Sequence, residues 1–238
     1  MVSIAGSKKL KRQMAPLFWG ITRKDKRFVI TVRPGAHSKH FSIPSAVFLR
    51  DTLKIVSSLR EAKSAIYGGK VSVDGVKRKS LHYGIGLMDV VELENVAETY
   101  RLVPLDGAIL KPIKIDDSEK TKKLCRVVSK TSIKGDKIQI GFHDGRSLIS
   151  DQKINVGDTC VMQVPEQKIL DVVKFEKGCQ AIVIQGINAG QVGTVEEIKE
   201  GTFVLPKMAS MKLGERQIEI PTDIIMAVGK DKPVIQIR

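Results

Sequence analysis

Regularly spaced turn residues divide the second half of the chain into short apolar segments. After Leu105, apolar and polar residues alternate, and turn pairs such as Asp106-Gly107 and Asp144-Gly145 interrupt the pattern. A period of two indicates strands, and closely spaced turns join strands in antiparallel order, without the long helices of βαβ units. Residues 106–238 are too many for one five- or six-stranded barrel, so we predict two small antiparallel barrels that divide near Leu170.

The preceding segment, residues 43–105, has the pattern of two short helices followed by strands. Ser42 is a suitable cap for the first helix. Ser58 and Glu61 have the spacing of a capping box for the second helix, in which each side chain accepts from the other residue's amide. Gly68-Gly69 then ends this helix. Two helices and a set of strands are therefore expected before the barrels.

Together these patterns predict an α+β fold that is mostly β. After residue 70 we expect at most one further short helix, at 118–124. The predicted parts are a basic N-terminal arm (1–42), a domain of two helices and strands (43–105), a central β-domain (106–170) and a last β-domain (171–238).

Positive charge is concentrated at the N-terminus. The chain has 40 Lys+Arg and 26 Asp+Glu, which gives a formal net charge of +14. Residues 1–42 hold ten basic side chains and a single acid, Asp25, whereas residues 171–238 have no net charge. This asymmetry is typical of a basic arm attached to a nearly neutral body.

Several classes of protein are disfavoured by the composition. No run reaches the roughly 18 apolar residues of a membrane-spanning helix, and no apolar segment follows the first lysines as it would in a secretory signal. Cys125, Cys160 and Cys179 are odd in number, far apart and without a CxxC pair, which argues against a disulfide framework or a zinc site. We expect reduced thiols and no membrane association.

The composition of the arm favours nucleic-acid binding. Cations neutralise phosphates, while aromatic and guanidinium planes stack on exposed bases, and the arm has both residue types. A merely solvated tail stays open as an alternative, but KKLKRQM is too short and too lightly apolar for a membrane-surface helix. Free of RNA, such a self-repelling arm is expected to be poorly ordered. The candidate RNA-binding residues here are Lys8, Lys9, Lys11, Arg12, Trp19, Arg23, Lys24, Lys26, Arg27, Arg33, His37, Lys39 and His40.

The stretch REAKSAIYGGKVSVDG combines the capped helix with a strand that turns at Asp74-Gly75. It resembles the alpha-L RNA-binding fold. We expect Arg60, Lys63, Lys70 and Lys77 to converge beside the helix N-terminus, whose dipole and free amides favour phosphate. An ordinary capped helix with solvated lysines is the alternative. The candidates on this domain are Arg50, Lys54, Arg60, Lys63, Lys70, Lys77, Arg78 and Lys79.

The stretch FEKGCQAIVIQGINAGQVGTVEEI has the pattern of a glycine-rich hairpin. Its glycines allow sharp turns and close backbone approach. It resembles the KOW motif, a strand-loop-strand of SH3-like barrels in ribosomal proteins and NusG-type factors. A nucleotide-binding phosphate loop is disfavoured, because no Gly-Lys-Ser/Thr ending or following helix is present. The loop candidates are Gly186, Asn188, Gly190 and Gly193.

No pattern of catalytic or metal-ligating residues stands out. The four histidines are scattered, and although His37 and His40 are three apart, no cysteine or carboxylate cluster accompanies them. The acidic pair Asp116-Asp117 borders a charged stretch and is typical of a solvated loop. We therefore predict no enzyme activity, no cofactor, no metal and no small-molecule substrate.

Matching segments extend along nearly the whole chain in the order of one known family. The segments include KKLKRQMAP, RPGAHSKHFSIPSAVFLRDTLKI, REAKSAIYGGKVSVDG, HYGIGLMDVVEL, YRLVPLDG and GINAGQVGTVEEI. On these motifs the chain resembles the archaeal/eukaryotic small-subunit ribosomal protein four-e family. It lacks the basic C-terminal extension of eukaryotic members, so an archaeal-type member is expected.

The resemblance implies a structural constituent of the small ribosomal subunit that binds and stabilises its rRNA in the cytoplasm. Its expected partners are small-subunit rRNA and neighbouring small-subunit ribosomal proteins. Two other functions stay open on the residues alone: an RNA-modifying enzyme with an alpha-L guide domain, and a KOW-type transcription or translation factor.

Overall fold

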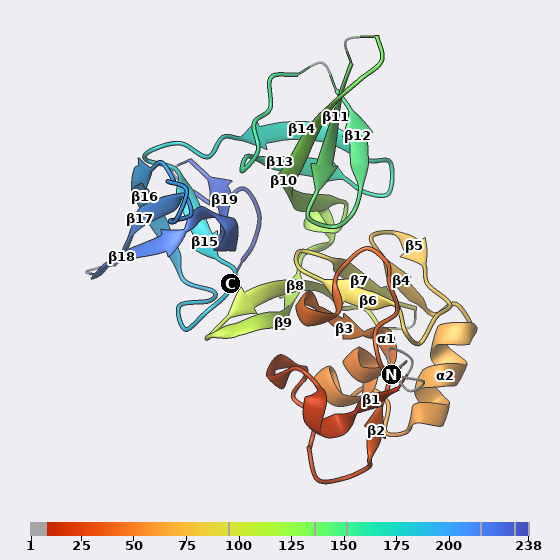
Figure 1. The fold of residues 1–238 in the computed structure, drawn as a ribbon. Helices are drawn as coiled ribbons and strands as arrows, with labels where there is room; N and C mark the ends of the chain where they lie inside the picture. Colours follow the sequence, from red (N-terminus) through yellow and green to blue (C-terminus); the bar gives the residue numbers. More distant parts are fainter. Residues whose placement is uncertain are drawn as a thin grey trace, which may run out of the picture.

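The computed structural model describes residues 9–94, 96–135, 137–150, 152–214, 216–230 and 232–237. Within these residues, three five-stranded sheets and two two-stranded pairs form, and all of their pairings are antiparallel. Figure 1 shows the first sheet beside the helices, with the other two sheets at the opposite end of the molecule. The prediction of a mostly β fold with few helices is confirmed.

The first sheet and the helices form one unit. The sheet order is β5-β4-β7-β8-β9. Its strands are β4 (Val71–Val73), β5 (Val76–Lys77), β7 (Val90–Leu93), β8 (Thr99–Leu105) and β9 (Ala108–Ile115). Beside it lie β3 (Ser42–Pro44), which pairs with β6 (Gly84–Gly86), and the helices α1 (Ser45–Val47), the π-helix η4 (Phe48–Thr52) and α2 (Leu59–Tyr67).

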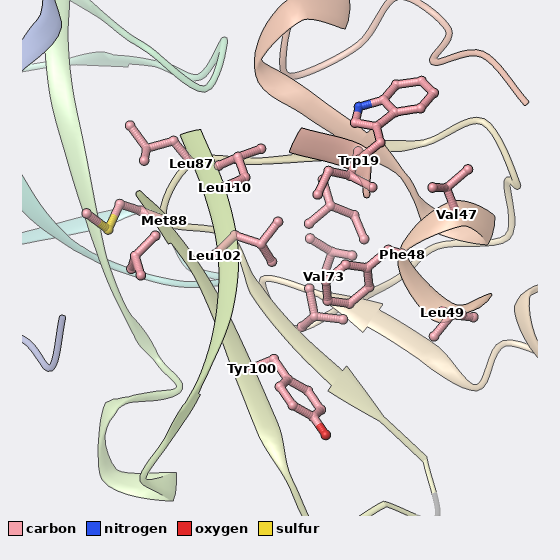
Figure 2. Close-up of a cluster of buried hydrophobic side chains, with 14 of the residues drawn as sticks. Trp19, Val47, Phe48, Leu49, Val73, Leu87, Met88, Tyr100, Leu102 and Leu110 are labelled. Atoms are coloured by element: carbon pink, nitrogen blue, oxygen red, sulfur yellow. The ribbon is translucent and has the colours of Figure 1, made fainter. Parts of the chain in front are cut away.

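The N-terminal segment, residues 9–42, packs on this unit. Its elements are β1 (Leu10–Lys11), η1 (Arg12–Met14), η2 (Leu17–Trp19), β2 (Phe28–Val29) and η3 (Lys39–Phe41). Leu10, Trp19 and Val32 are buried in the same core as Phe48 and Leu102, as Figure 2 shows for Trp19. The expectation of a poorly ordered arm is wrong for these residues, because their apolar side chains anchor the segment.

Two further sheets follow, each with its own core. The second sheet has the order β12-β11-β10-β13-β14 and the third β18-β17-β16-β15-β19. The second contains β10 (Lys122–Ile133), β11 (Lys137–Phe142), β12 (Ser147–Ile149), β13 (Thr159–Gln163) and β14 (Lys168–Val173). The third contains β15 (Gln180–Val183), β16 (Val192–Lys199), β17 (Met208–Leu213), β18 (Arg216–Pro221) and β19 (Ile225–Gly229). Two 3-10 turns complete the elements, η5 (Asp117–Glu119) and η6 (Thr222–Ile224).

The sheets divide the chain at different places from those predicted. The breaks lie at 116–121 and 174–179, whereas Leu105 is the last residue of β8 and Leu170 lies inside β14. Asp106-Gly107 forms the turn of the β8–β9 hairpin, which is why a change of pattern there did not mark a boundary.

Two helix predictions also need correction. Ser42 lies in β3 and pairs with Gly86, so it caps no helix, and α1 begins three residues later. The helix expected at 118–124 is only a 3-10 turn, and from Lys122 the chain is strand β10. The second helix forms as predicted, with Ser58 as its N-cap.

The C-terminal segment returns to the first unit. Ile235 and Ile237 belong to the core that contains Trp19 and Leu102. The fully buried guanidinium of Arg101 donates to the carbonyl of Gln236 at 3.1 Å. In Figure 1 the C-terminus accordingly lies close to β8, between the first and third sheets.

Candidate nucleic-acid interface

A groove of about 1000 Å³ lies between the N-terminal segment and the junction of η4 with α2. We call it the N-terminal groove. Its charged lining consists of Lys9, Arg12, Asp25, Lys26, Arg50, Asp51 and Lys54, and its apolar lining includes Phe28, Val29, Ile30 and Val56. The fold thus brings together basic residues from two segments that are more than twenty residues apart in sequence.

The groove has an excess of positive charge. Arg12 lies 3.5 Å from Asp25, and Arg50 donates two hydrogen bonds, of 3.1 and 2.7 Å, to Asp51. Within the part of the chain that the structure describes, the ammonium groups of Lys9, Lys26 and Lys54 have no carboxylate within 4.0 Å. These three exposed lysines are therefore available to phosphates.

The N-terminus of α2 is closed by its own side chains. The Ser58 hydroxyl accepts from the amide of Glu61 at 3.2 Å, and the Glu61 carboxylate accepts from the amide of Ser57 at 3.0 Å. The bonds from Ser57 and Ser58 hold the pKa of Glu61 below its ordinary value. A carboxylate already faces the positive end of the helix, so the predicted phosphate site at this helix terminus is not supported.

The basic residues after α2 gather at its other end. A Cβ added to Gly69 would lie 3.6 Å from Lys79 Cε and 3.8 Å from Lys77 Cδ. Lys63, one turn back on α2, places its ammonium 5.6 Å from the centroid of the half-exposed Tyr67 ring. We call Lys63, Tyr67, Lys70, Lys77 and Lys79 the α2 C-terminal cluster. The expected convergence of Arg60, Lys63, Lys70 and Lys77 at the helix N-terminus is wrong, because Lys70 and Lys77 lie at the C-terminal end of α2.

Four sequence candidates are removed from the interface by burial or packing. Trp19 is 1% exposed, and its indole N–H donates to the carbonyl of Ser42 at 2.8 Å. Arg12 is 4% exposed, although it lines the groove, and His37 is 6% exposed. Arg78 is half-buried, with its guanidinium 4.7 Å from the ring centroid of Tyr83. A buried indole offers no face to a base, so Trp19 cannot stack on RNA.

The remaining basic candidates are on the surface, with one outside the described residues. Lys8 lies outside the part that the structure describes, and Arg50 is half-buried in its ion pair with Asp51. The exposed candidates are Lys9, Lys11, Arg23, Lys24, Lys26, Arg27, Arg33, Lys39, His40, Lys54, Arg60, Lys63, Lys70, Lys77 and Lys79.

The glycine-rich loop between β15 and β16 contacts protein. The amide of Gly107, in the β8–β9 turn, donates to the carbonyl of Ala189 at 3.0 Å. A Cβ on Gly190 would lie 2.5 Å from Leu105 Cα, and one on Gly193 would lie 2.4 Å from the carbonyl oxygen of Lys212. Gly186 is exposed with open space around it, and Asn188 is half-buried. Gly190 and Gly193 are thus positions where only glycine fits, because other backbone lies against them.

Sequence reasoning missed a buried ionic network between the first two sheets. Lys123, 1% exposed, lies 2.8 Å from Asp74, 2.5 Å from Asp89 and 3.1 Å from Asp144, and Arg146 bonds to Asp74 and Asp144. Burial opposes its charge, yet the carboxylates hold the pKa of Lys123 well above its ordinary value. Lys123 follows another lysine in the sequence, and nothing local marks it as buried.

The described residues show neither a metal centre nor a membrane span. No group of three or more His, Cys, Asp or Glu side chains among them could hold a metal ion. No helix in the same ranges is long and apolar enough to cross a membrane. Cys125, Cys160 and Cys179 are buried and free, and Cys125 and Cys160 face each other on β10 and β13.

Comparison with known proteins gives consistent matches along the chain. The family model described as Ribosomal family S4e matches residues 96–169, and the RS4NT (NUC023) domain matches residues 5–40. The small ribosomal subunit protein eS4 of Methanothermobacter thermautotrophicus is 34% identical over 238 residues, covering 100% of this chain and 98% of that protein. The eS4 protein of Ignicoccus hospitalis is 35% identical over 249 residues, with the same two coverages.

A solved structure agrees with these matches. The crystal structure of the 30S ribosomal protein S4e from Thermoplasma acidophilum superposes with a TM-score of 0.68 at 33% sequence identity, covering 80% of this chain and 96% of that one. The family predicted from the sequence motifs is confirmed. The chain belongs to the eS4 family of small ribosomal subunit proteins, a family of ribosomal structural proteins and not of enzymes.

Proposed function

We propose that this protein binds and stabilises small-subunit rRNA through the N-terminal groove and the α2 C-terminal cluster. The observation that carries the proposal is the set of three lysines in the groove, Lys9, Lys26 and Lys54, which have no acidic partner among the described residues. Neutralising phosphates with such lysines releases counterions and supplies most of the affinity for RNA. The uneven charge of the chain supports the same assignment, because +9 of its net charge of +14 lies in the first 42 residues.

The arrangement around α2 supports an alpha-L RNA-binding domain, predicted at 43–105, whose sheet is continued by β9 to Ile115. A helix of nine residues ends at Gly68 and leads directly into the β4–β5 hairpin, whose turn at Asp74-Gly75 has positive φ at both residues. Lys70, Lys77 and Lys79 stand on the outside of this turn and helix end. Since phosphate contacts position a protein without reading sequence, we assign these lysines to docking on folded RNA.

The two later β-domains, predicted at 106–170 and, as an SH3-like KOW domain, at 171–238, correspond to the second and third sheets, which begin at Lys122 and Gln180, and we assign them as packing surfaces. Residues 171–238 have no net charge, and the KOW loop at Ala189 and Gly190 rests on the β8–β9 turn. Neither property favours strong phosphate binding. We therefore assign these domains to contacts within the protein and with neighbouring proteins of the small subunit, in the cytoplasm.

The salt dependence of binding tests the proposal. We would titrate purified small-subunit rRNA with the wild-type chain and with a triple variant, Lys9→Ala, Lys26→Ala, Lys54→Ala, over a series of salt concentrations. Each lost phosphate contact flattens the slope of log K against log salt by about 0.7–0.9, so the triple variant should differ by about 2–3.

A matched triple variant controls for net charge. Lys177, Lys212 and Lys230 are exposed residues of the last domain, and replacing all three with Ala removes the same charge. The control should keep the wild-type slope. Equal slopes for the groove triple and the wild type would refute the assignment of the groove.

A further inference from the structure

Phe28 is an exposed aromatic residue of the N-terminal groove. The residue is 45% exposed and lines the groove. β2 holds it in place, since Phe28 is paired in register with Lys11 of β1. Burial excludes Trp19 from such a role, so Phe28 is the aromatic residue of the N-terminal segment that the groove presents.

Two cations flank the Phe28 ring. Lys9 Nζ lies 6.0 Å and Arg27 Cζ lies 5.3 Å from the ring centroid. Cations at these distances are attracted to the electron-rich face of an aromatic ring. Both cations belong to long, exposed side chains, so a base that stacks on the ring face displaces them sideways and leaves them free to pair with phosphates.

The rest of the groove suits a nucleotide in size and polarity. Its volume of about 1000 Å³ is at the upper end of the range of small-ligand pockets, which leaves room for a nucleotide. Val29 and Ile30 continue the apolar wall next to Phe28, and Lys26 and Lys54 supply positive charge. An apolar platform with cations along it is the arrangement with which proteins hold single-stranded nucleic acid.

We propose that the N-terminal groove binds an unpaired nucleotide of the RNA. Its base stacks on Phe28, and the adjoining phosphates contact Lys9, Lys26 and Lys54. The inference rests on the proposed function and adds to it the state of the RNA at this site. A paired base is excluded because both of its faces are stacked inside a helix, whereas loop and bulge bases are free to stack on protein.

The test compares single-stranded with duplex RNA on the full-length protein. Fluorescence anisotropy at fixed salt would measure the affinity of the wild type and of Phe28→Leu for an unstructured pyrimidine oligoribonucleotide and for a blunt RNA duplex. Leucine keeps an apolar side chain at this position but has no aromatic face. One base–aromatic stack corresponds to a loss of about 5- to 150-fold for the single strand, and the duplex affinity should stay within about twofold.

Two more variants complete the design. Phe28→Tyr keeps the ring and should retain single-strand affinity, which separates stacking from a structural effect of the substitution. Phe203→Ala removes a fully exposed ring from the third sheet's β16–β17 connection and should leave both affinities unchanged.

The outcomes distinguish this inference from the proposed function. If Phe28→Leu binds single-stranded and duplex RNA with wild-type affinity, or loses affinity for both equally, the proposal that the groove binds an unpaired nucleotide is refuted. The lysine triple variant would in that case still report on rRNA binding by the groove. If instead the triple variant keeps the wild-type salt slope, the proposed function itself fails.

Discussion

Replacing Lys123 with Met tests whether the buried ionic network fastens the second sheet to the first unit. Lys123 lies on β10, and its ammonium is within 3.1 Å of three buried carboxylates, those of Asp74, Asp89 and Asp144. Removing one partner of a buried ion pair costs about 3–5 kcal/mol, because it leaves an uncompensated charge in the interior. Arg146 still contacts two of the carboxylates, and His37 Nε2 lies 3.0 Å from the third.

Because each carboxylate keeps one partner, we expect the lower end of that range, about 3 kcal/mol. For a chain of this length, 1 kcal/mol corresponds to roughly 2–4 °C, so the melting temperature should fall by about 6–12 °C. Circular dichroism at neutral pH would measure it. The control is Lys122→Met, an exposed neighbour on the same strand, which should change stability by less than about 0.5 kcal/mol. Equal melting temperatures for the two variants would refute the reasoning.

Three further predictions concern the core, the pH response and the KOW loop. Trp19→Phe leaves the Ser42 carbonyl without its donor and should cost about 1–3 kcal/mol in urea unfolding, with RNA affinity unchanged within about twofold. Burial lowers the pKa of His143 from 6.5 to about 4. Between pH 6.5 and pH 4 the unfolded chain therefore binds more protons than the folded protein, and the free energy of unfolding decreases as the pH falls through this range. Relative to His143→Gln, the wild type should therefore lose about 2 kcal/mol more between pH 7 and pH 4.5, and parallel losses would contradict this. Gly190→Ala and Gly178→Ala both place Ala at positive φ, but only the Cβ at position 190 would meet other backbone, at 2.5 Å. Thermal melts should therefore show a larger fall in melting temperature for Gly190→Ala than for Gly178→Ala.

The geometry of the His143 ring gives that pH response its cause. The amide of Arg126 donates to Nδ1 at 3.1 Å, and Nε2 lies 3.3 Å from the carbonyl of Leu87. An imidazole that accepts at one nitrogen and donates at the other is neutral. Protonation places a proton on Nδ1, which then faces the Arg126 N–H instead of accepting from it.

Local patterns in the sequence predicted the strands and their turns. Asp74-Gly75 and Asp106-Gly107 form hairpin turns with positive φ, as tight Asp-Gly turns require. The capping box also formed, and the Glu61 carboxylate in addition accepts from the Ser57 amide at 3.0 Å. These features depend on residues within a few positions of each other, so the sequence contains the information to predict them.

The burial of Trp19 and the formation of the N-terminal groove depend on long-range packing, which local sequence patterns do not reveal. Trp19 lies in a short apolar run, residues 15–21, inside the basic segment, and its indole N–H donates to the Ser42 carbonyl 23 residues away while its ring joins the main core. The N-terminal groove likewise needs residues near Lys9 and residues near Lys54 to meet. Composition predicted that the segment would bind RNA, but which of its aromatic rings stays exposed depends on the fold.

The protection of individual lysines from acetylation when rRNA is bound tests the central claim most directly. We would acetylate the protein free and bound to small-subunit rRNA, and quantify each modified lysine by mass spectrometry. Protection by RNA should be strong at Lys9, Lys26 and Lys54 in the groove and weak at Lys177 and Lys212 in the last domain. Protection of the last two with full reactivity in the groove would contradict the account.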